Sequence, residues 1–399
     1  MKVKSSSLYI VLVIGVLIVI LLGGFLLLVK NKMLFNSKIS NVSDDLKSLD
    51  KSILTYPKLS STVSVNTDYW GAFTKIEATN KELTKDALLL NAKDSLVPSI
   101  YLEDHNSPLV IAGGSQIAGV VKIPKGYWKL GAISGNYFRG TLTKVNQVLR
   151  SQELPVLDSK WRKYIKKILN SNRSNYIGNY NMFFKSRTNI FDKPTLYYSS
   201  DQGTYLQGQY IGNIIIKDNV EIEVSKEADL RDVLLVAPKI VIADNFKGNI
   251  HCITNEISVG KNVRLIYPSS ICALEKKTRK KKIINNWENI PDIKVGNNTF
   301  INGPVIFLKE NTNDDRKANI QFEKGSKIIG DIYCEGYTEL RGSVIGSVYT
   351  SYFIYTHQGS KYINYLFDAN IDSNFKISRY SGGLPFASSG NYILASWLY

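Results

Sequence analysis

The chain has 399 residues, of which 44% are hydrophobic, and this composition excludes an intrinsically disordered protein. The formal charge of +16 favours anionic partners such as phospholipid headgroups or acidic polysaccharide, although a Lys-rich solvated surface gives the same sum. The three Cys are widely spaced and form no CxxC motif, and the chain has only three His, so we expect no metal and no cofactor. One Cys pair could still form a disulfide in an exported domain.

The first predicted element is an apolar, uncharged segment of 22 residues that begins at Leu8 and ends at Val29. At about 1.5 Å per residue, a helix of this length spans roughly 33 Å, enough for the hydrocarbon core of a bilayer. The segment is longer than the apolar region of a cleavable signal peptide, and no small-x-small site follows it. The sequence therefore predicts an uncleaved transmembrane anchor over residues 1–30, and a single-pass integral membrane protein.

The charges that flank this segment are nearly balanced. Lys2 and Lys4 precede it, and Lys30, Lys32 and Lys38 follow it. Because a short N-terminal tail normally stays in the cytoplasm, we expect a protein of the cytoplasmic (inner) membrane with its C-terminal domain on the outer, periplasmic side.

Residues 31–107 are expected to form a membrane-proximal linker and a small region. Ser43 precedes an acidic first turn, and Leu46, Leu49 and Ile53 follow at helical spacing, which predicts a short helix. The stretch YWGAFTKIE, which begins at Tyr69, predicts one strand whose aromatic residues pack in the core.

From about residue 108 a nine-residue pattern recurs, with apolar first and third positions and Asn or Gly at the sixth. The alternation predicts strands, and Asn and Gly are the residues that most easily adopt left-handed backbone angles. The copies begin at Val121, Ile214, Ile240, Ile257, Ile293 and Ile320. The predicted corner residues are Gly126, Asn219, Asn245, Asn262, Asn298 and Gly325.

A strand, a left-handed corner and another strand, repeated in this way, indicate a parallel β-helix, whose loops leave at corners without disturbing the stack. The predicted fold class is therefore mainly β: one N-terminal transmembrane helix followed by an irregular parallel (right-handed) β-helix over residues 108–350. A β-sandwich with similar turns is the alternative.

Residues 141–190 are predicted to be a helical insertion in this domain. Val145, Val148 and Leu149 lie at helical spacing before Pro155, and Ser159 is expected to cap a second helix. The second helix would expose a basic face, either to an anionic membrane or to solvent as a cover over the β-helix. That face holds Lys160, Arg162, Lys163, Lys166 and Lys167.

A second basic run, EKKTRKKK, begins at Glu275 and is expected to be a solvated loop. Neither basic run has the interleaved aromatic residues or the known module that nucleic-acid recognition requires, so we expect no nucleic acid among the partners. The candidate contacts to anionic lipid headgroups or polysaccharide are Lys163, Lys166, Lys167, Arg279, Lys280 and Lys281.

Residues 351–399 are rich in Tyr and Phe. An apolar segment after the last coil is expected to cap the open strand edges there, because unpaired edges invite strand addition. The alternative is a surface that binds a partner.

The stretches SQIAGVVKI, NIIIKDNVEIEV, GSKIIGDIY and RGSVIGSVY resemble coils of the bactofilin, or polymer-forming cytoskeletal, group. The resemblance covers residues 109–130 and 205–348, and it lies in the Gly-x-apolar rhythm. It implies a right-handed β-helix that polymerises end to end without nucleotide. The helical insertion, the long loops and the C-terminal segment depart from the short, uniform chains of that group, which puts polymerisation in doubt.

Polysaccharide-cleaving enzymes also use β-helices, with clustered acids and bases on one face. The candidates are Asp229, Arg231 and Asp232, and a second group of Asp314, Asp315, Arg316 and Lys317. Neither group recurs in adjacent copies, so we expect no catalytic residues. The sequence favours a non-catalytic scaffold or assembly component of the cell envelope or a surface apparatus, acting through protein partners or self-association. The alternatives are an envelope protein that binds or cleaves acidic polysaccharide, and a bactofilin-like polymer on the cytoplasmic side.

Overall fold

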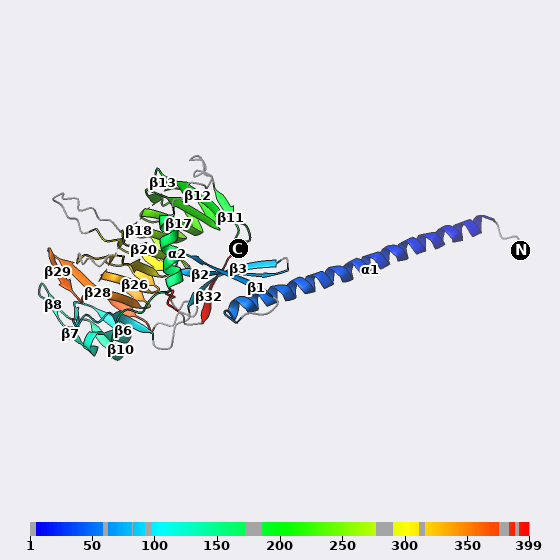
Figure 1. Cartoon of the computed structure of the whole chain (residues 1–399). Coiled ribbons are helices and arrows are strands. Elements are labelled where there is room, and N and C mark those ends of the chain that lie inside the picture. Colours follow the sequence, from blue (N-terminus) through cyan, green and yellow to red (C-terminus); the bar gives the residue numbers. More distant parts are fainter. Residues whose placement is uncertain are drawn as a thin grey trace.

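The chain folds into a long N-terminal helix, a small antiparallel sheet and a parallel β-helix (Figure 1). The computed structural model describes residues 5–58, 63–81, 83–91, 97–171, 186–276, 290–310, 316–374, 383–387 and 391–398. The predicted fold class is confirmed in its main features: the chain is mainly β, its N-terminal helix is apolar, and its strands pair in parallel. The handedness of the β-helix stays a prediction.

Helix α1 (Ser5–Leu54) is continuous for 50 residues, about 75 Å at the rise of an α-helix. It contains the apolar segment of residues 8–29, and it is the one helix in the described part of the chain that is long and apolar enough to cross a membrane. The short helix predicted near Ser43 is the last part of this same helix, not a separate element. No Gly or Pro lies between Val29 and Leu54 to end it.

The small sheet lies between α1 and the β-helix. It contains β1 (Ser64–Trp70), β2 (Phe73–Asn80), β3 (Leu83–Asn91) and β32 (Tyr392–Leu398), antiparallel in that order. Along β3, Ala87 and Leu89 pack with Leu49 and Ile53 of α1, whereas Leu88 and Leu90 pack toward the β-helix. The single strand predicted from Tyr69 is wrong, because the chain reverses after Trp70 and forms a hairpin.

The β-helix consists of three stacks of parallel strands, in which successive coils of the chain pair with one another. The first stack contains β11 (Arg187–Asn189), β14 (Gln209–Gly212), the starts of β17 (Asp229–Ile242) and β18 (Lys247–Val259), β19 (Arg264–Leu265), β22 (Phe300–Asn302), β25 (Lys327–Ile329), β27 (Ser343–Ile345), β31 (Asn370–Asp372), β6 (Gln116–Ile123) and β10 (Thr141–Arg150).

The second stack contains β12 (Leu196–Ser200), β15 (Ile214–Asp218), the middles of β17 and β18, β20 (Ser270–Leu274), β23 (Val305–Leu308), β26 (Ile332–Leu340), β28 (Val348–His357) and β4 (Pro98–Leu102), followed by β6 and β10. The third stack contains β13 (Thr204–Leu206), β16 (Ile222–Val224), the ends of β17 and β18, β21 (Ile293–Val295), β24 (Ile320–Phe322) and the ends of β26 and β28, and continues through β30 (Tyr365–Phe367), β5 (Leu109–Ala112) and β7 (Trp128–Leu130). The 3-10 turn η1 (Pro124–Gly126), the hairpin of β8 (Ala132–Ile133) and β9 (Asn136–Tyr137), and β29 (Ser360–Ile363), which pairs with β28, extend from the corners.

The coils do not stack in chain order. Residues 98–150 form the coils at one end, α2 (Ser159–Asn170) follows them in the chain, and β11 lies at the other end, from which the chain winds back (Figure 1). Its last coil meets the first, because Val348 pairs with Ile100 and Asn370 with Gln116. The β-helix therefore extends beyond the expected 108–350, and residues 351–372 form part of a coil and not a cap.

The second stack is apolar on both faces. In β18 and β20, Cys252 and Ile271 point into the β-helix, and Ile253 and Cys272 point outward against the small sheet and α2. A strand buried on both faces has a continuous apolar sequence, which explains runs such as SICAL and VIFL. All three Cys are buried free thiols.

The helical insertion is shorter than predicted. The first predicted helix is wrong: its residues form β10, whose Val145 and Val148 pair with β6 and pack against the core of the β-helix. The β-branched side chains suit a strand, and tertiary pairing overrides the helical spacing. Helix α2 is confirmed, but its N-cap is Asp158, whose carboxylate accepts the Lys160 N–H at 2.6 Å, and not Ser159.

Four of the predicted corners lie at the same corner of successive coils, between the third and first stacks. Asn245, Asn262, Asn298 and Gly325 have φ of +65°, +55°, +56° and +78°. Asn219 follows the second stack instead and keeps a negative φ, so its prediction as a left-handed corner is wrong. Gly126 also follows the second stack, with a φ of +69°, at the end of η1.

We expect Asn262→Ala to lower the free energy of unfolding of the full-length chain by about 1 kcal/mol. Alanine is strained in the left-handed region, which Asn tolerates better. Asn262→Gly should be nearly neutral. Asn219→Ala is the matched control, since its backbone angle suits any residue. Thermal unfolding in detergent measures all three, and equal losses for Asn262→Ala and Asn219→Ala would contradict the assignment of the corner.

Candidate functional site

The basic face predicted on α2 is divided between the β-helix and solvent. Arg162 donates to both carboxylate oxygens of Glu335, at 2.6 and 2.9 Å, and Lys166 lies 2.6 Å from the Glu310 carboxylate. Two of the predicted cations therefore fasten α2 to the β-helix, whereas Lys160, Lys163 and Lys167 stay exposed to solvent.

Several of the predicted site residues cannot be placed. Arg279, Lys280, Lys281, Asp314 and Asp315 lie outside the described residues. Lys317, which was predicted together with Asp314 and Asp315, lies 3.2 Å from the Asp292 carboxylate and donates to the Ile290 carbonyl. It belongs to a structural ion pair.

The remaining acidic candidates are also engaged. Asp229 pairs with Arg231 at 2.9 Å, which holds the pKa of this carboxyl below its usual range. Asp232 accepts a hydrogen bond from the Asn249 amide at 2.7 Å, while burial raises its pKa. Asp229 and Asp232 therefore face different partners and do not pair with each other.

A His–Ser pair, which the sequence did not reveal, lies on the outer face of the second stack. The Nδ1 atom of His251 is 3.0 Å from the Ser270 hydroxyl, which also accepts the Ala72 N–H at 3.2 Å. Both side chains are fully buried. The two residues pair in register on neighbouring coils, so the coil length of 19 residues is the signal that could have located them.

This pair cannot act as a nucleophile and base, because no substrate can reach it. Burial lowers the pKa of His251 to about 3, so the imidazole is neutral, and its Nε2 atom has no partner among the described residues. The Phe73 ring packs edge-on at 5.4 Å. The pair holds the β1–β2 turn of the small sheet against the β-helix.

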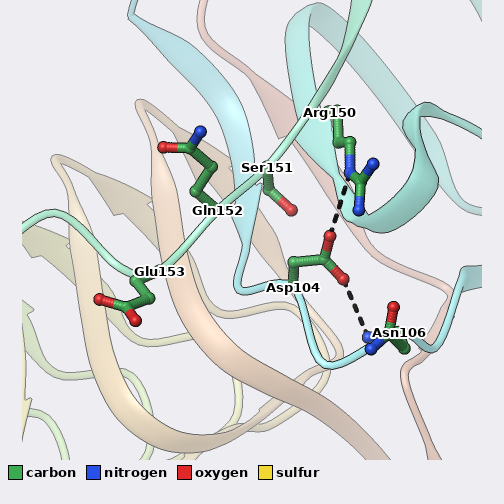
Figure 2. A pocket seen from close by; sticks show the side chains of 6 residues that line it. All are labelled: Asp104, Asn106, Arg150, Ser151, Gln152 and Glu153. Atoms are coloured by element: carbon green, nitrogen blue, oxygen red, sulfur yellow. Dashed lines mark hydrogen bonds and ion pairs between the residues drawn. The ribbon is translucent and has the colours of Figure 1, made fainter.

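An open polar groove of about 490 Å³ lies where the chain leaves β10, and Figure 2 shows the side chains that line it. They are Asp104, Asn106, Arg150, Ser151, Gln152 and Glu153. The Asp104 carboxylate lies between Arg150, at 3.3 Å, and the Asn106 N–H, at 2.9 Å (Figure 2). Sequence reasoning missed the groove, because its two sides are about 46 residues apart and Arg150 was assigned to a helix.

The groove does not fit a metal ion. The Asn106 N–H and the Arg150 guanidinium lower the pKa of Asp104, but they also occupy the carboxylate oxygens that a cation would need. The Ser151 hydroxyl is buried and has no partner in the described part of the chain. The donors and acceptors of the groove suit a polar, hydroxyl-bearing ligand, but no aromatic side chain is among the six residues that line it.

A second cleft, of about 280 Å³, lies between α2, β1 and the edge of the second stack. Tyr164, Tyr197 and Tyr198 line it together with Lys167, Lys217 and Asp68. Lys217 donates to the Ile168 carbonyl at 2.8 Å and so also closes the C-terminal end of α2. Aromatic walls with two cations and one acid could hold a sugar ring that carries a negative charge.

Aromatic side chains also stack in register along the coils. Tyr101 stacks on Tyr349 at 5.7 Å, and His105 stacks on Tyr352 at 4.2 Å, which in turn stacks on Tyr337 at 4.7 Å. In each stack the ring faces cover one another, so they offer little platform for a bound sugar. They act instead as cross-strand pairs that stabilise neighbouring coils.

Because His251 binds a proton only in the unfolded chain between pH 6.5 and about 3, its contribution to stability is complete above pH 6.5 and is lost as the pH falls toward 3. Taken alone, His251 should decrease the free energy of unfolding by up to about 1.4 kcal/mol for each pH unit below 6.5 in this window. His251→Gln, which cannot titrate, should flatten this slope. The check is the melting temperature of the full-length chain in detergent between pH 4 and 7.5.

Asp86 acts with the opposite sign. Burial outweighs Lys75 and raises its pKa to about 6, so its contribution is present below pH 3.8 and is lost as the pH rises through 6. Asp86→Asn is therefore the control that should steepen the acid slope. An unchanged slope in His251→Gln would contradict the role given to the histidine.

Comparisons with protein-family models, with curated proteins and with solved structures found no match. The resemblance to bactofilins therefore stays a prediction.

Proposed function

We propose that the chain is a non-catalytic scaffold or assembly component of the cell envelope or a surface apparatus, held in the cytoplasmic membrane by the apolar part of α1. In this proposal the β-helix lies on the outer side of the membrane. The observation that carries it is the continuity of α1, which passes without a break from its apolar segment into the core of the small sheet. A helix that served only for export would need no such packing.

We refer to the small sheet and the β-helix together as the β-domain. The contacts between α1 and the β-domain support a rigid attachment. Leu49 and Ile53 are 0% and 1% exposed against the small sheet. Polar contacts flank them, since the Asn80 amide donates to Asp45 at 3.0 Å and Lys85 pairs with Asp50. Apolar burial with ion pairs at its edge holds a helix at a defined angle, as a scaffold requires.

The joint between the small sheet and the β-helix is equally well held. The indole N–H of Trp70 donates to the Asp232 carbonyl, and that of Trp161 donates to the Gly71 carbonyl, both at 2.9 Å. Both indole rings are buried. The described residues therefore link the apolar segment to the β-helix through buried contacts.

The proposed orientation predicts that protease added to intact spheroplasts degrades the β-domain and leaves a small fragment that contains residues 8–29. The control is a cytoplasmic marker, which should survive until the cells are lysed. If the β-domain also survived until lysis, the domain would be cytoplasmic, and the bactofilin-like polymer on that side would become the better proposal.

A second candidate function, binding of acidic polysaccharide, is favoured by the cleft that Tyr164, Tyr197 and Lys167 line. We expect Lys167→Glu to weaken retention of the protein on an anionic polysaccharide several-fold, because it reverses one of the two positive charges of the cleft. Lys144→Glu, on an exposed position of β10, makes the same change of net charge elsewhere. Equal losses in the two variants would show that the net charge, and not the cleft, binds the polymer.

A further inference from the structure

Helix α1 carries an apolar stripe between its membrane-length segment and the small sheet. Phe35, Ile39, Val42 and Leu46 are 63%, 52%, 46% and 39% exposed, and we refer to these four residues as the α1 stripe. They follow one another at intervals of four, three and four residues, which places them on one face of the helix. Within the described part of the chain, no element other than α1 covers them.

The α1 stripe is the middle of a longer seam with the same spacing. In the C-terminal direction the seam continues through Leu49 and Ile53, which the small sheet buries. In the N-terminal direction it continues through Leu28, Phe25 and Leu21, within the apolar segment. The C-terminal end of the seam is therefore buried by the small sheet, and the N-terminal end would be surrounded by lipid. The α1 stripe between them is covered by neither.

An uncovered stripe here is unfavourable for two reasons. Residues 30–42 are all exposed, and a helix of about 12–15 residues is only marginally stable in water without packing. Large apolar side chains also lose the stabilisation that their burial would contribute. A partner that covered the stripe would remove both costs.

The spacing identifies what kind of partner fits. A seam that repeats every 3.5 residues packs best against another helix with the same seam, as a left-handed coiled coil. Two copies anchored in one membrane run in parallel and hold their stripes at the same height. The residues that flank the stripe are Asn36, Lys38 and Ser43. In a parallel pair, Lys38 of one copy would lie beside the neutral Ser43 of the other, so these positions bring no like charges together.

We propose that the α1 stripe is a self-association surface, and that two copies of the chain pair in parallel through it and through the seam of the apolar segment. Lys32 occupies a seam position near the lipid headgroups, where its long side chain can reach outward, and a single polar seam residue sets register and orientation. The two helices separate at Leu49, where each seam turns to its own small sheet.

The size of the surface limits the pairing to the membrane. Four half-exposed side chains on each copy bury on the order of 700 Å² in total, below the roughly 1,200–2,000 Å² of stable soluble interfaces. Confinement of both copies to one lipid layer, with fixed orientation, raises their effective concentration and compensates for the small area.

The proposal rests on the membrane anchor of the proposed function, and single-Cys cross-linking in native membranes tests it. Ile39→Cys and Val42→Cys place a thiol on the seam, and Ser37→Cys and Asp44→Cys place one on the opposite face. Because Cys252, Cys272 and Cys334 are buried, the unaltered chain is the background. Oxidation should give a band of twice the chain mass several-fold more strongly for the two seam variants than for the two control variants.

Adding Val42→Lys to Ile39→Cys should reduce this band, since a charge then enters the seam. Equal yields at all four positions, or a seam product whose mass is not twice that of the chain, would overturn the self-association. Neither result depends on the side of the membrane that holds the β-domain. Failure of the pairing would therefore leave the protease experiment, and the scaffold role that it tests, unaffected.

Discussion

The apolar outer face of the second stack is the constraint on which the remaining architecture depends. Leu234, Ile253 and Ile306 point away from the interior of the β-helix and would lie in water if nothing covered them. At roughly 1.5–3 kcal/mol for each large apolar side chain, leaving this face bare would cost more than a domain's usual net stability. The small sheet and α2 cover it, and the small sheet in turn positions α1.

The cover closes at one turn, between β1 and β2. Gly71 has a φ of +62°, and a Cβ at this position would lie 2.3 Å from the Ser270 hydroxyl and 2.9 Å from the Cβ of His251. Only Gly allows the turn to approach the second stack this closely. The neutral, buried imidazole and its serine partner are therefore a consequence of close packing, and they resemble catalytic machinery only in the types of residue involved.

The sequence predicts repeated local geometry well and long-range order poorly. Asn245, Asn262, Asn298 and Gly325 could be identified because each coil repeats the same backbone demand at the same corner. The stacking of Val348 on Ile100 could not, because parallel pairing is set by tertiary packing and leaves no local signal. The groove at Asp104 lies between segments about 46 residues apart in the chain, which no local pattern brings together. The helical spacing of Val145 and Val148 in β10 likewise gives no sign that this segment pairs with β6.

The stacking order also determines how the β-helix is mounted. Because the first and last coils of the chain lie side by side, both ends of the chain leave the β-helix at the same level, and β3 pairs with β32 there, as Asp86 with Leu398. The small sheet and α1 consequently attach to one side of the β-helix, while the coils at its two ends, with β12 and β10, belong to neither terminus (Figure 1). In a β-helix whose coils stack in chain order, an N-terminal helix would adjoin one of the end coils. Lateral attachment instead leaves both end coils free of α1, so the self-association proposed for α1 would not involve the ends of the β-helix.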